Sequence, residues 1–246
     1  QTLPAARHAQ LRQHHHRMMS LARSDTFPVL DIQSVPLTLS DVPRIYALYR
    51  TALDAVPNPA AVRADEPSFF EEVFAVGGEI MGLQVDGDLV SYGVLRPELE
   101  SEHDRSGLDD HVPASAGLRV LDGSAVHPQH WKHGLQRVII EARVERAGAL
   151  GAQHVIAKAS PGNVPSMRNL LRCGFRIVTR VRKPYGWRYV HHRPVAHPFP
   201  RPDGGEWRPA SDVVGATALF ANDHAAVACR AEAGTPLLCF AKIPAS

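Results

Sequence analysis

The sequence predicts an α/β fold in which helices flank a mixed β-sheet. Short apolar runs alternate along the chain with segments whose apolar residues recur at helical spacing, and this alternation is typical of α/β domains. An Asp-Gly pair joins two of the runs and favours a tight hairpin. With 246 residues, 44% of them hydrophobic, the chain is long enough to bury a sizeable core.

The first half of the chain is expected to contain two amphipathic helices and a hairpin. Pro67 suits the first turn of the second helix, because its missing N–H would have no partner there. Asp86-Gly87 favours the positive φ angles of a two-residue hairpin turn. The expected elements are an extended run, two helices and two strands, at 29–35, 41–55, 67–76, 80–85 and 89–95.

Residues 98–116 are polar and rich in acidic side chains, and no strand or helix is predicted there. This composition indicates a solvated linker. The alternative is an ordered loop that covers a site, because long ordered loops are uncommon in compact domains without such a function.

The second half of the chain repeats the alternation of strands and helices. After a strand over 118–126, a helix opens at Gly134 and ends between Gly148 and Gly151. The remaining expected elements are a strand, a short helix and two further strands, at 154–160, 164–172, 175–181 and 187–195.

The two ends of the chain differ in composition from the main domain, which we place at 29–195. Residues 1–28 lack the apolar segment of a secretory signal, and we expect a flexible leader. Residues 196–210 are rich in Pro and Gly and predict a partly stiff linker. Residues 211–246 predict an αββ extension that is too small for a core of its own. We expect this extension to dock on the main domain or on a second subunit.

The overall composition argues against several classes of protein. No apolar run reaches the ~20 residues that a membrane span needs. The net charge of +2 is too small to indicate an overall nucleic-acid-binding surface. The three cysteines are an odd number without C-x-x-C spacing. A reducing compartment, the cytoplasm, is therefore the expected location.

Familiar catalytic motifs are absent from the sequence. It contains no P-loop, no G-x-G-x-x-G after a strand, no G-x-S-x-G elbow and no H-E-x-x-H. His127, His130 and His133 are spaced by three, but Pro128 lies among them, so no regular helical face aligns them. We therefore predict no metal site.

The turn that enters the helix at Gly134 is a candidate anion site. A helix N-terminus leaves up to four backbone N–H groups without partners, with the positive end of the helix dipole behind them. Such an end suits a phosphate or pyrophosphate. Lys132, His133 and Arg137 would add positive charge around it. The alternative is an ordinary βα turn whose glycine serves packing.

Two sequence blocks resemble the GNAT N-acetyltransferase superfamily, which transfers acyl groups from coenzyme A. In that family a V-x-P strand end precedes a Q/R-x-x-G-x-G/A loop that binds pyrophosphate, and here residues 131–136 follow Val-His-Pro. Residues 163–175 match a second block, in which an asparagine precedes a helix and a terminal Gly-Phe. The resemblance covers about 29–195 and implies the mixed sheet of the family and an acyl-CoA cofactor. The residues it implies for cofactor binding are Ala125, Val126, Trp131, Lys132, His133, Gly134, Leu135, Gln136, Arg137, Asn163 and Ser166.

The sequence departs from the family pattern at three positions. Trp131 stands where Gln or Arg is usual, and Gln136 stands where Gly or Ala is usual. Leu170 occupies the position at which the family often has a tyrosine as general acid. Because a thiol leaves readily, catalysis without a dedicated acid, with solvent in that role, is plausible.

The strand over 118–126 supplies the candidate catalytic residues, Asp122 and Ser124. Side chains alternate along a strand, so these two share a face with Val120 and Val126 if no bulge intervenes. In the family this strand commonly contributes a carboxylate near the acceptor amine, which implies Asp122 as the base. A structural Asp122 at a strand kink is the alternative. Other base candidates, less favoured, are Glu79 and Tyr92.

The resemblance implies an acyl-CoA-dependent N-acyltransferase that moves an acetyl group from acetyl-CoA to a primary amine by direct attack. The acceptor would be a small molecule or a peptide, and a homodimer is expected, with neither nucleic acid nor membrane as a partner. The alternative is a non-catalytic module of the same fold that binds acyl-CoA or a protein partner.

Overall fold

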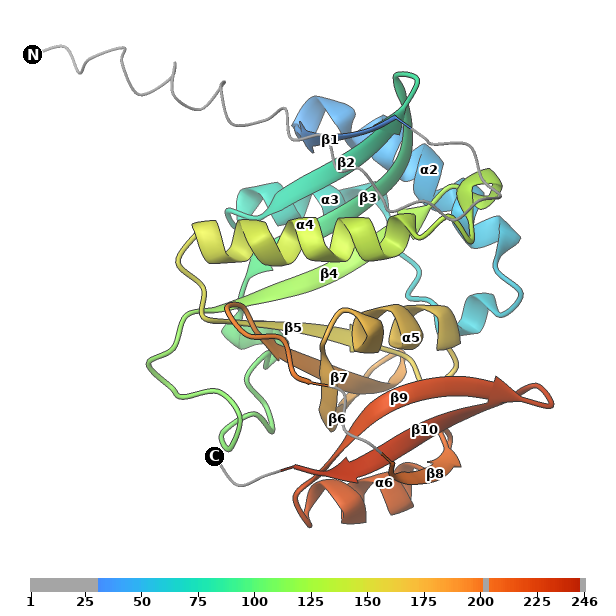
Figure 1. Cartoon of the computed structure of the whole chain (residues 1–246). Coiled ribbons are helices and arrows are strands. Elements are labelled where there is room, and N and C mark those ends of the chain that lie inside the picture. The colour runs from blue at the N-terminus through green and yellow to red at the C-terminus, as the bar shows by residue number, and fades with distance from the viewer. Residues whose placement is uncertain (1–30, 201–203, 244–246) are drawn as a thin grey trace, which may run out of the picture.

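A computed structural model describes residues 31–200 and 204–243 of the chain (Figure 1). Ten strands form one mixed sheet in the order β1-β2-β3-β4-β5-β7-β6-β9-β10-β8. The predicted α/β fold with a mixed sheet flanked by helices is therefore confirmed. The leader expected at 1–28 lies outside the described residues.

The first half of the chain forms the elements that the sequence predicts. Asp86 and Gly87 both have positive φ, as the predicted two-residue turn requires (φ 52° and 87°). A capping box of Thr38 and Asp41 precedes the first helix. The elements are β1 (Ile32–Leu37), α2 (Val42–Ala55), α3 (Pro67–Ala75), β2 (Glu79–Val85) and β3 (Asp88–Pro97), with short 3-10 helices η1 (Leu39–Asp41) and η2 (Pro59–Ala61).

In the second half of the main domain, predicted and observed elements agree within two residues at their ends, and the helix predicted to open at Gly134 starts at Leu135. The strand at 118–126 and the helix at 164–172 have the predicted bounds. The elements are η3 (Glu100–Glu102), β4 (Leu118–Val126), η4 (Pro128–His130), α4 (Leu135–Ala149), β5 (His154–Ala159), α5 (Val164–Arg172), β6 (Arg176–Lys183) and β7 (Gly186–Pro194).

The prediction of a solvated linker at 98–116 is wrong. Leu108, Val112 and Ala116 are buried in a cluster with strand residues of the sheet. The side chain of Asp104 is buried as well and forms ion pairs with Arg96 and Lys158. The segment is an ordered loop that covers one face of the sheet.

The C-terminal extension continues the sheet of the main domain (Figure 1). It contains α6 (Val213–Phe220), β9 (His224–Glu232) and β10 (Thr235–Lys242). The linker prediction is wrong at its end, because β8 (Glu206–Pro209) lies there and pairs with β10. Strand β9 meets β6, and side chains of α5 and α6 share one buried cluster with both strands. The extension therefore docks on the main domain.

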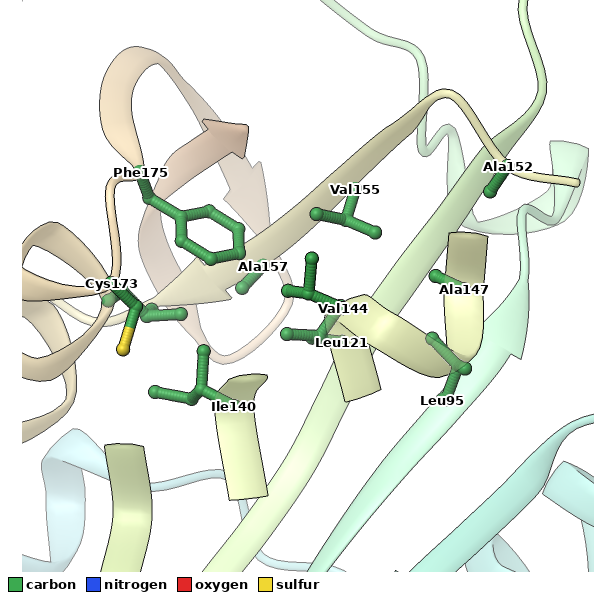
Figure 2. Close-up of a cluster of buried hydrophobic side chains, with 11 residues drawn as sticks. Leu95, Leu121, Ile140, Val144, Ala147, Ala152, Val155, Ala157, Cys173 and Phe175 are labelled. Atoms are coloured by element: carbon green, nitrogen blue, oxygen red, sulfur yellow. The ribbon is translucent and has the colours of Figure 1, made fainter. Parts of the chain in front are cut away.

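Helices cover both faces of the central strands. Leu95 of β3 packs with Ile140 and Val144 of α4 on one face (Figure 2). The preceding residue, Val94, points to the opposite face and packs with side chains of α2 and α3. Each fully buried side chain of this kind contributes roughly 1.5–3 kcal/mol relative to an exposed one. No helix in the described part of the chain is both long and apolar enough to span a membrane.

Strands β4 and β5 separate before they end. They form the parallel pair of the sheet, and their pairing runs from Leu118–His154 to Leu121–Ala157. Beyond Leu121 one edge of β4 therefore has no strand partner and is an open edge. The residues expected to bind the cofactor lie on β4, in the segment between β4 and α4, on α4 and at the start of α5.

Candidate functional site

A β-bulge interrupts β4 at the start of its open edge. Strand β3 pairs Gly93 with Ser124 and Leu95 with Leu121, so β4 has one residue more than its partner between these pairs. The predicted common face for alternate β4 residues is therefore wrong. Leu121 faces α4, Asp122 and Gly123 both face α3, and Ser124 faces α4 again.

Asp122 lies in an ion-pair network on the α3 face. Its Oδ2 accepts a hydrogen bond from Nε of Arg96 at 2.8 Å, and its Oδ1 is 3.5 Å from Nη2 of Arg63. Burial alone would raise the pKa of this carboxyl. The charges of Arg63 and Arg96, with the hydrogen bond from Arg96, outweigh burial and hold the pKa of Asp122 below its usual range. A carboxylate held in this way is a weak base, which favours a structural role at the strand kink.

The network extends from Asp122 to the loop at 98–116. Arg96 also donates to Asp104 (Nη1 to Oδ2, 2.6 Å), and Asp104 in turn accepts from Lys158 of β5. Glu102 pairs with Lys183 of β6 at 2.7 Å. The loop thus supplies the acids that neutralise the cations of the sheet on this face.

Asp65, which the sequence analysis did not single out, lies directly over the bulge. A Cβ placed on Gly123 would be 3.7 Å from its Oδ2. The side chain of Asp65 is 8% exposed and pairs with Arg63, while Tyr49 accepts its backbone N–H at 2.9 Å. Burial raises the pKa of Asp65 against the opposing charge of Arg63. Its position just before a predicted helix carried no catalytic signal, since only the folded chain brings it to β4.

The two less favoured base candidates are occupied elsewhere. Glu79 forms two hydrogen bonds of 2.7 Å with Arg146 of α4, which lower its pKa. Tyr92 is fully buried against Phe70, with ring centroids 5.5 Å apart, and burial raises its pKa well above the usual value. Neither group is poised to accept a proton.

The backbone of Val126 points to the open edge of β4. The N–H of His127 donates to Val90 of β3 at 2.8 Å. Since consecutive backbone groups of a strand point to opposite edges, the N–H and C=O of Val126 point away from β3. The carbonyl of Ala125 instead faces β3 and accepts from the hydroxyl of Ser91 at 2.9 Å. The indole of Trp131 donates to the Val126 carbonyl at 2.7 Å.

The loop between β4 and α4 has the geometry of an anion site. Lys132 and Gly134 both have positive φ (71° and 79°), which is uncommon for a lysine and marks a constrained loop. The first intrahelical hydrogen bond runs from Arg137 N to Gly134 O, so the amides of residues 135 and 136 precede the bonded part of the helix. The guanidinium of Arg137 lies beside Gly134, 3.3 Å from a Cβ placed there. His133 belongs to the same loop.

Two of the predicted cofactor residues in this helix serve packing with their side chains. Leu135 is buried in a cluster with Val138 and Ile139. Gln136 accepts a hydrogen bond of 2.7 Å from Asn169 and so links α4 to α5. This bond gives a reason for glutamine at a position where the family pattern has a small residue. The side chain of Leu135 is thus unavailable to an anion, and the side-chain oxygen of Gln136 is already bonded.

Helix α5 follows β5, the strand that separates from β4, and contacts α4 through Asn169. Asn163 caps it by accepting the backbone N–H of Ser166 at 3.2 Å. Leu170 lies in the buried cluster around α4, so it contributes to the core. Among residues 31–200 and 204–243, no group of three or more His, Cys, Asp or Glu side chains is placed to hold a metal ion.

Comparisons with known proteins agree with this architecture. Residues 42–175 match the family model described as the acetyltransferase (GNAT) family. Three similar solved structures are a GNAT-family protein from Desulfovibrio desulfuricans (17% identity, 67% of this chain and 99% of that chain, TM-score 0.51), the ribosomal-protein-S18-alanine N-acetyltransferase from Escherichia coli (16%, 67% and 94%, 0.51) and Ard1 from Thermoplasma volcanium (13%, 66% and 97%, 0.51).

At these identities the solved structures establish the fold alone. No curated protein matches the sequence. The family model, in contrast, spans more than half of the 246 residues, including β4, α4 and α5. The chain therefore belongs to the GNAT acetyltransferase family, whose acyl donor is an acyl-CoA, as the sequence predicted.

Proposed function

We propose that the protein is an N-acyltransferase that moves an acetyl group from acetyl-CoA to a primary amine. The observation that carries the proposal is the open edge of β4 beside the loop before α4, in a chain of the GNAT family. An anion held at the loop and an extended arm along the open edge would place an acyl group at the bulge.

The pyrophosphate of the cofactor would be held by backbone N–H groups of residues 132–136, since the N–H of Arg137 is bonded to Gly134. The positive φ of Lys132 and Gly134 turns the loop around such a group, and the dipole of α4 favours its charge. The side chains of Lys132 and Arg137 add positive charge, and His133 lies in the same loop. In this arrangement Trp131 borders the site through its bond to Val126.

The arm of the cofactor would run along the open edge of β4. The N–H of Val126 points into this edge and would polarise the thioester carbonyl. Ala125 and Ser124 continue the strand towards the bulge, and Asn163 and Ser166 of α5 line the other side. Adding an extended segment to a free strand edge is a common mode of recognition.

When bound, acetyl-CoA would supply a thioester whose carbonyl carbon the amine attacks, so that a C–N bond forms and the C–S bond breaks. CoA would leave as a thiolate, which takes up the second proton of the nitrogen through solvent. The amine reaches the site as an ammonium ion and must first lose a proton. Asp65 accepts that proton, because its pKa is raised and its carboxylate lies over the bulge. Asp122, paired with two arginines, positions Arg63 and through it Asp65.

The experiment is a thiol-release assay with acetyl-CoA and a panel of primary amines, together with calorimetric titration of acetyl-CoA into the protein. We expect binding of acetyl-CoA and amine-dependent release of CoA. Absence of binding to any acyl-CoA would contradict the proposal.

The non-catalytic alternative is favoured by two observations. Leu170 lies in the core, and Trp131 occupies the Val126 carbonyl on the edge where the arm would pair. Binding of acetyl-CoA without CoA release from any amine would support this alternative. The homodimer and the cytoplasmic location expected from the sequence remain predictions.

A further inference from the structure

Arg188 of β7 is a buried cation without an acidic partner in the described residues. It is 6% exposed, and no carboxylate between 31 and 200 or between 204 and 243 forms an ion pair with it. Its Nη1 donates to the carbonyl of Trp187 at 2.9 Å, and its guanidinium lies 4.6 Å from the ring centroid of Tyr185. Burial lowers its pKa. A guanidinium has five N–H donors, so these contacts use only part of its capacity.

Arg143 shows how the same fold satisfies a buried arginine that has no ligand to bind. It is 2% exposed and forms no ion pair among the described side chains, but it donates to three backbone carbonyls, those of Ile139, Val94 and Asp122. No nitrogen of Arg188 is both fully enclosed and without a hydrogen-bond partner, whereas Nε of Arg176 is. The N–H groups of Arg188 that make no bond within the chain therefore reach solvent, where an anion that arrives with the substrate can bind them.

Arg188 lies at the meeting point of two elements above the bulge. The Tyr185 ring is 4.6 Å from the guanidinium of Arg188 and 6.0 Å from that of Arg63. Arg63 in turn pairs with Asp65 and Asp122. The tip of the β6–β7 hairpin and the segment before α3 thus converge on the face of β4 opposite α4. Tyr185 is 42% exposed, so this meeting point opens to solvent.

We propose that the acceptor is an amine that also carries a carboxylate, an amino acid or a close analogue. This inference rests on the proposed N-acyltransferase function. The carboxylate binds the free N–H groups of Arg188, since a guanidinium and a carboxylate match in a bidentate pair. The ammonium group lies towards Asp65 at the bulge, where the proton is removed. The positive charge of Arg188 also disfavours amines that carry further cations.

The test compares amino acids with their own carboxamides, which keep the amine and lose the negative charge. Glycine, L-phenylalanine, L-methionine and L-glutamate are assayed with acetyl-CoA beside their α-carboxamides. We expect at least one acid to exceed its amide in kcat/KM by about tenfold or more. Arg188→Gln should remove that preference through KM, and Arg188→Lys should keep part of it.

Arg176→Gln is the matched control. Arg176 is 8% exposed, has no acidic partner among the described residues and stacks on Phe199 at 4.2 Å, but it lies on β6 by the extension. Its loss should affect stability as the loss of Arg188 does, without changing the preference for acids. Arg188→Lys keeps the test available if Arg188→Gln does not fold.

A binding experiment separates this inference from the proposed function. The four acids are titrated by calorimetry into the full chain saturated with CoA, with and without Arg188→Lys. Binding of an acid that weakens in the variant supports the carboxylate site even if no acetyl group is transferred. Acetylation of amides and acids at equal efficiency, or no binding of any acid, overturns the inference while leaving acyl transfer intact.

Discussion

The two sides of β4 differ in the kind of chemical group that forms each candidate site. On the α4 face the candidate cofactor site consists mainly of backbone groups, the amides before α4 and the open edge at Val126. On the α3 face the candidate acceptor site consists of buried and partly buried charged side chains, among them Asp65, Asp122 and Arg96. A backbone site tolerates many substitutions, whereas a buried ion pair does not tolerate the loss of one partner. The predictions below probe this difference.

The largest effect is expected for Asp65→Asn. If Asp65 accepts the proton of the amine, this variant should lower kcat/KM by about 10²- to 10⁴-fold, with binding of acetyl-CoA unchanged. Because the pKa of Asp65 is raised, the activity of the wild type should fall on acidification at a higher pH than an ordinary aspartate would give. In the pH profile of Asp65→Asn this decrease in activity at low pH, the acidic limb of the profile, should be absent.

Asp122→Asn is the companion variant for this measurement. Its carboxylate has a lowered pKa and acts on Arg63, so the change should reduce activity and keep the acidic limb of the pH profile. If instead Asp122→Asn removes the limb and Asp65→Asn retains it, the roles of the two carboxylates are reversed.

The second largest effect is expected on the free energy of unfolding. Arg96→Met removes the partner that the buried carboxylate of Asp104 shares with the partly buried carboxylate of Asp122. We expect the free energy of unfolding to fall by about 3–5 kcal/mol, measured with urea. The control is Arg50→Met, which breaks an exposed pair with Asp54 and should change stability by no more than about 0.5 kcal/mol. Equal losses in the two variants would contradict the contrast between the faces.

A group of histidines near the loop at 98–116, two of them buried, should make the free energy of unfolding depend on pH. His192 stacks on His154 with centroids 5.1 Å apart, and His111 lies 6.2 Å away. Burial lowers the pKa of His192 to about 3 and that of the neighbouring His191 to about 4. These rings stay neutral in the folded state, while the unfolded chain takes up protons near pH 6.5.

The unfolding free energy should therefore decrease as the pH falls from about 6.5 towards 4, by an amount on the order of 2 kcal/mol. His192→Phe should flatten this slope, because the ring already packs against Phe199 at 5.5 Å. Urea unfolding of the wild type and of His192→Phe at pH 7.5, 6 and 5 measures how the unfolding free energy depends on pH. An unchanged slope would show that the protons bind elsewhere.

The difference between the faces also explains how far the sequence could predict the molecule. The strand at 118–126 and the helix at 164–172 were predictable because their apolar periodicity is local. The loop at 98–116 was not, since the three apolar residues it buries are scattered among acidic ones. The backbone site was predictable from the motif around Gly134. Asp65 and the bulge were not, because both depend on contacts between segments far apart in the sequence.

The smallest effect is expected for Trp131→Phe, on the α4 face of β4, where the candidate cofactor site consists mainly of backbone groups. The indole N–H of Trp131 occupies the Val126 carbonyl, which an extended cofactor arm would otherwise reach. Removing this single hydrogen bond should strengthen acetyl-CoA binding a few-fold, in line with about 1 kcal/mol for one bond. Trp207→Phe is the control, because Trp207 is equally exposed, at 38% against 36%, but lies on β8 beside Arg230. If Trp131→Phe weakens binding, the indole itself contacts the cofactor, and side chains matter on this face as well.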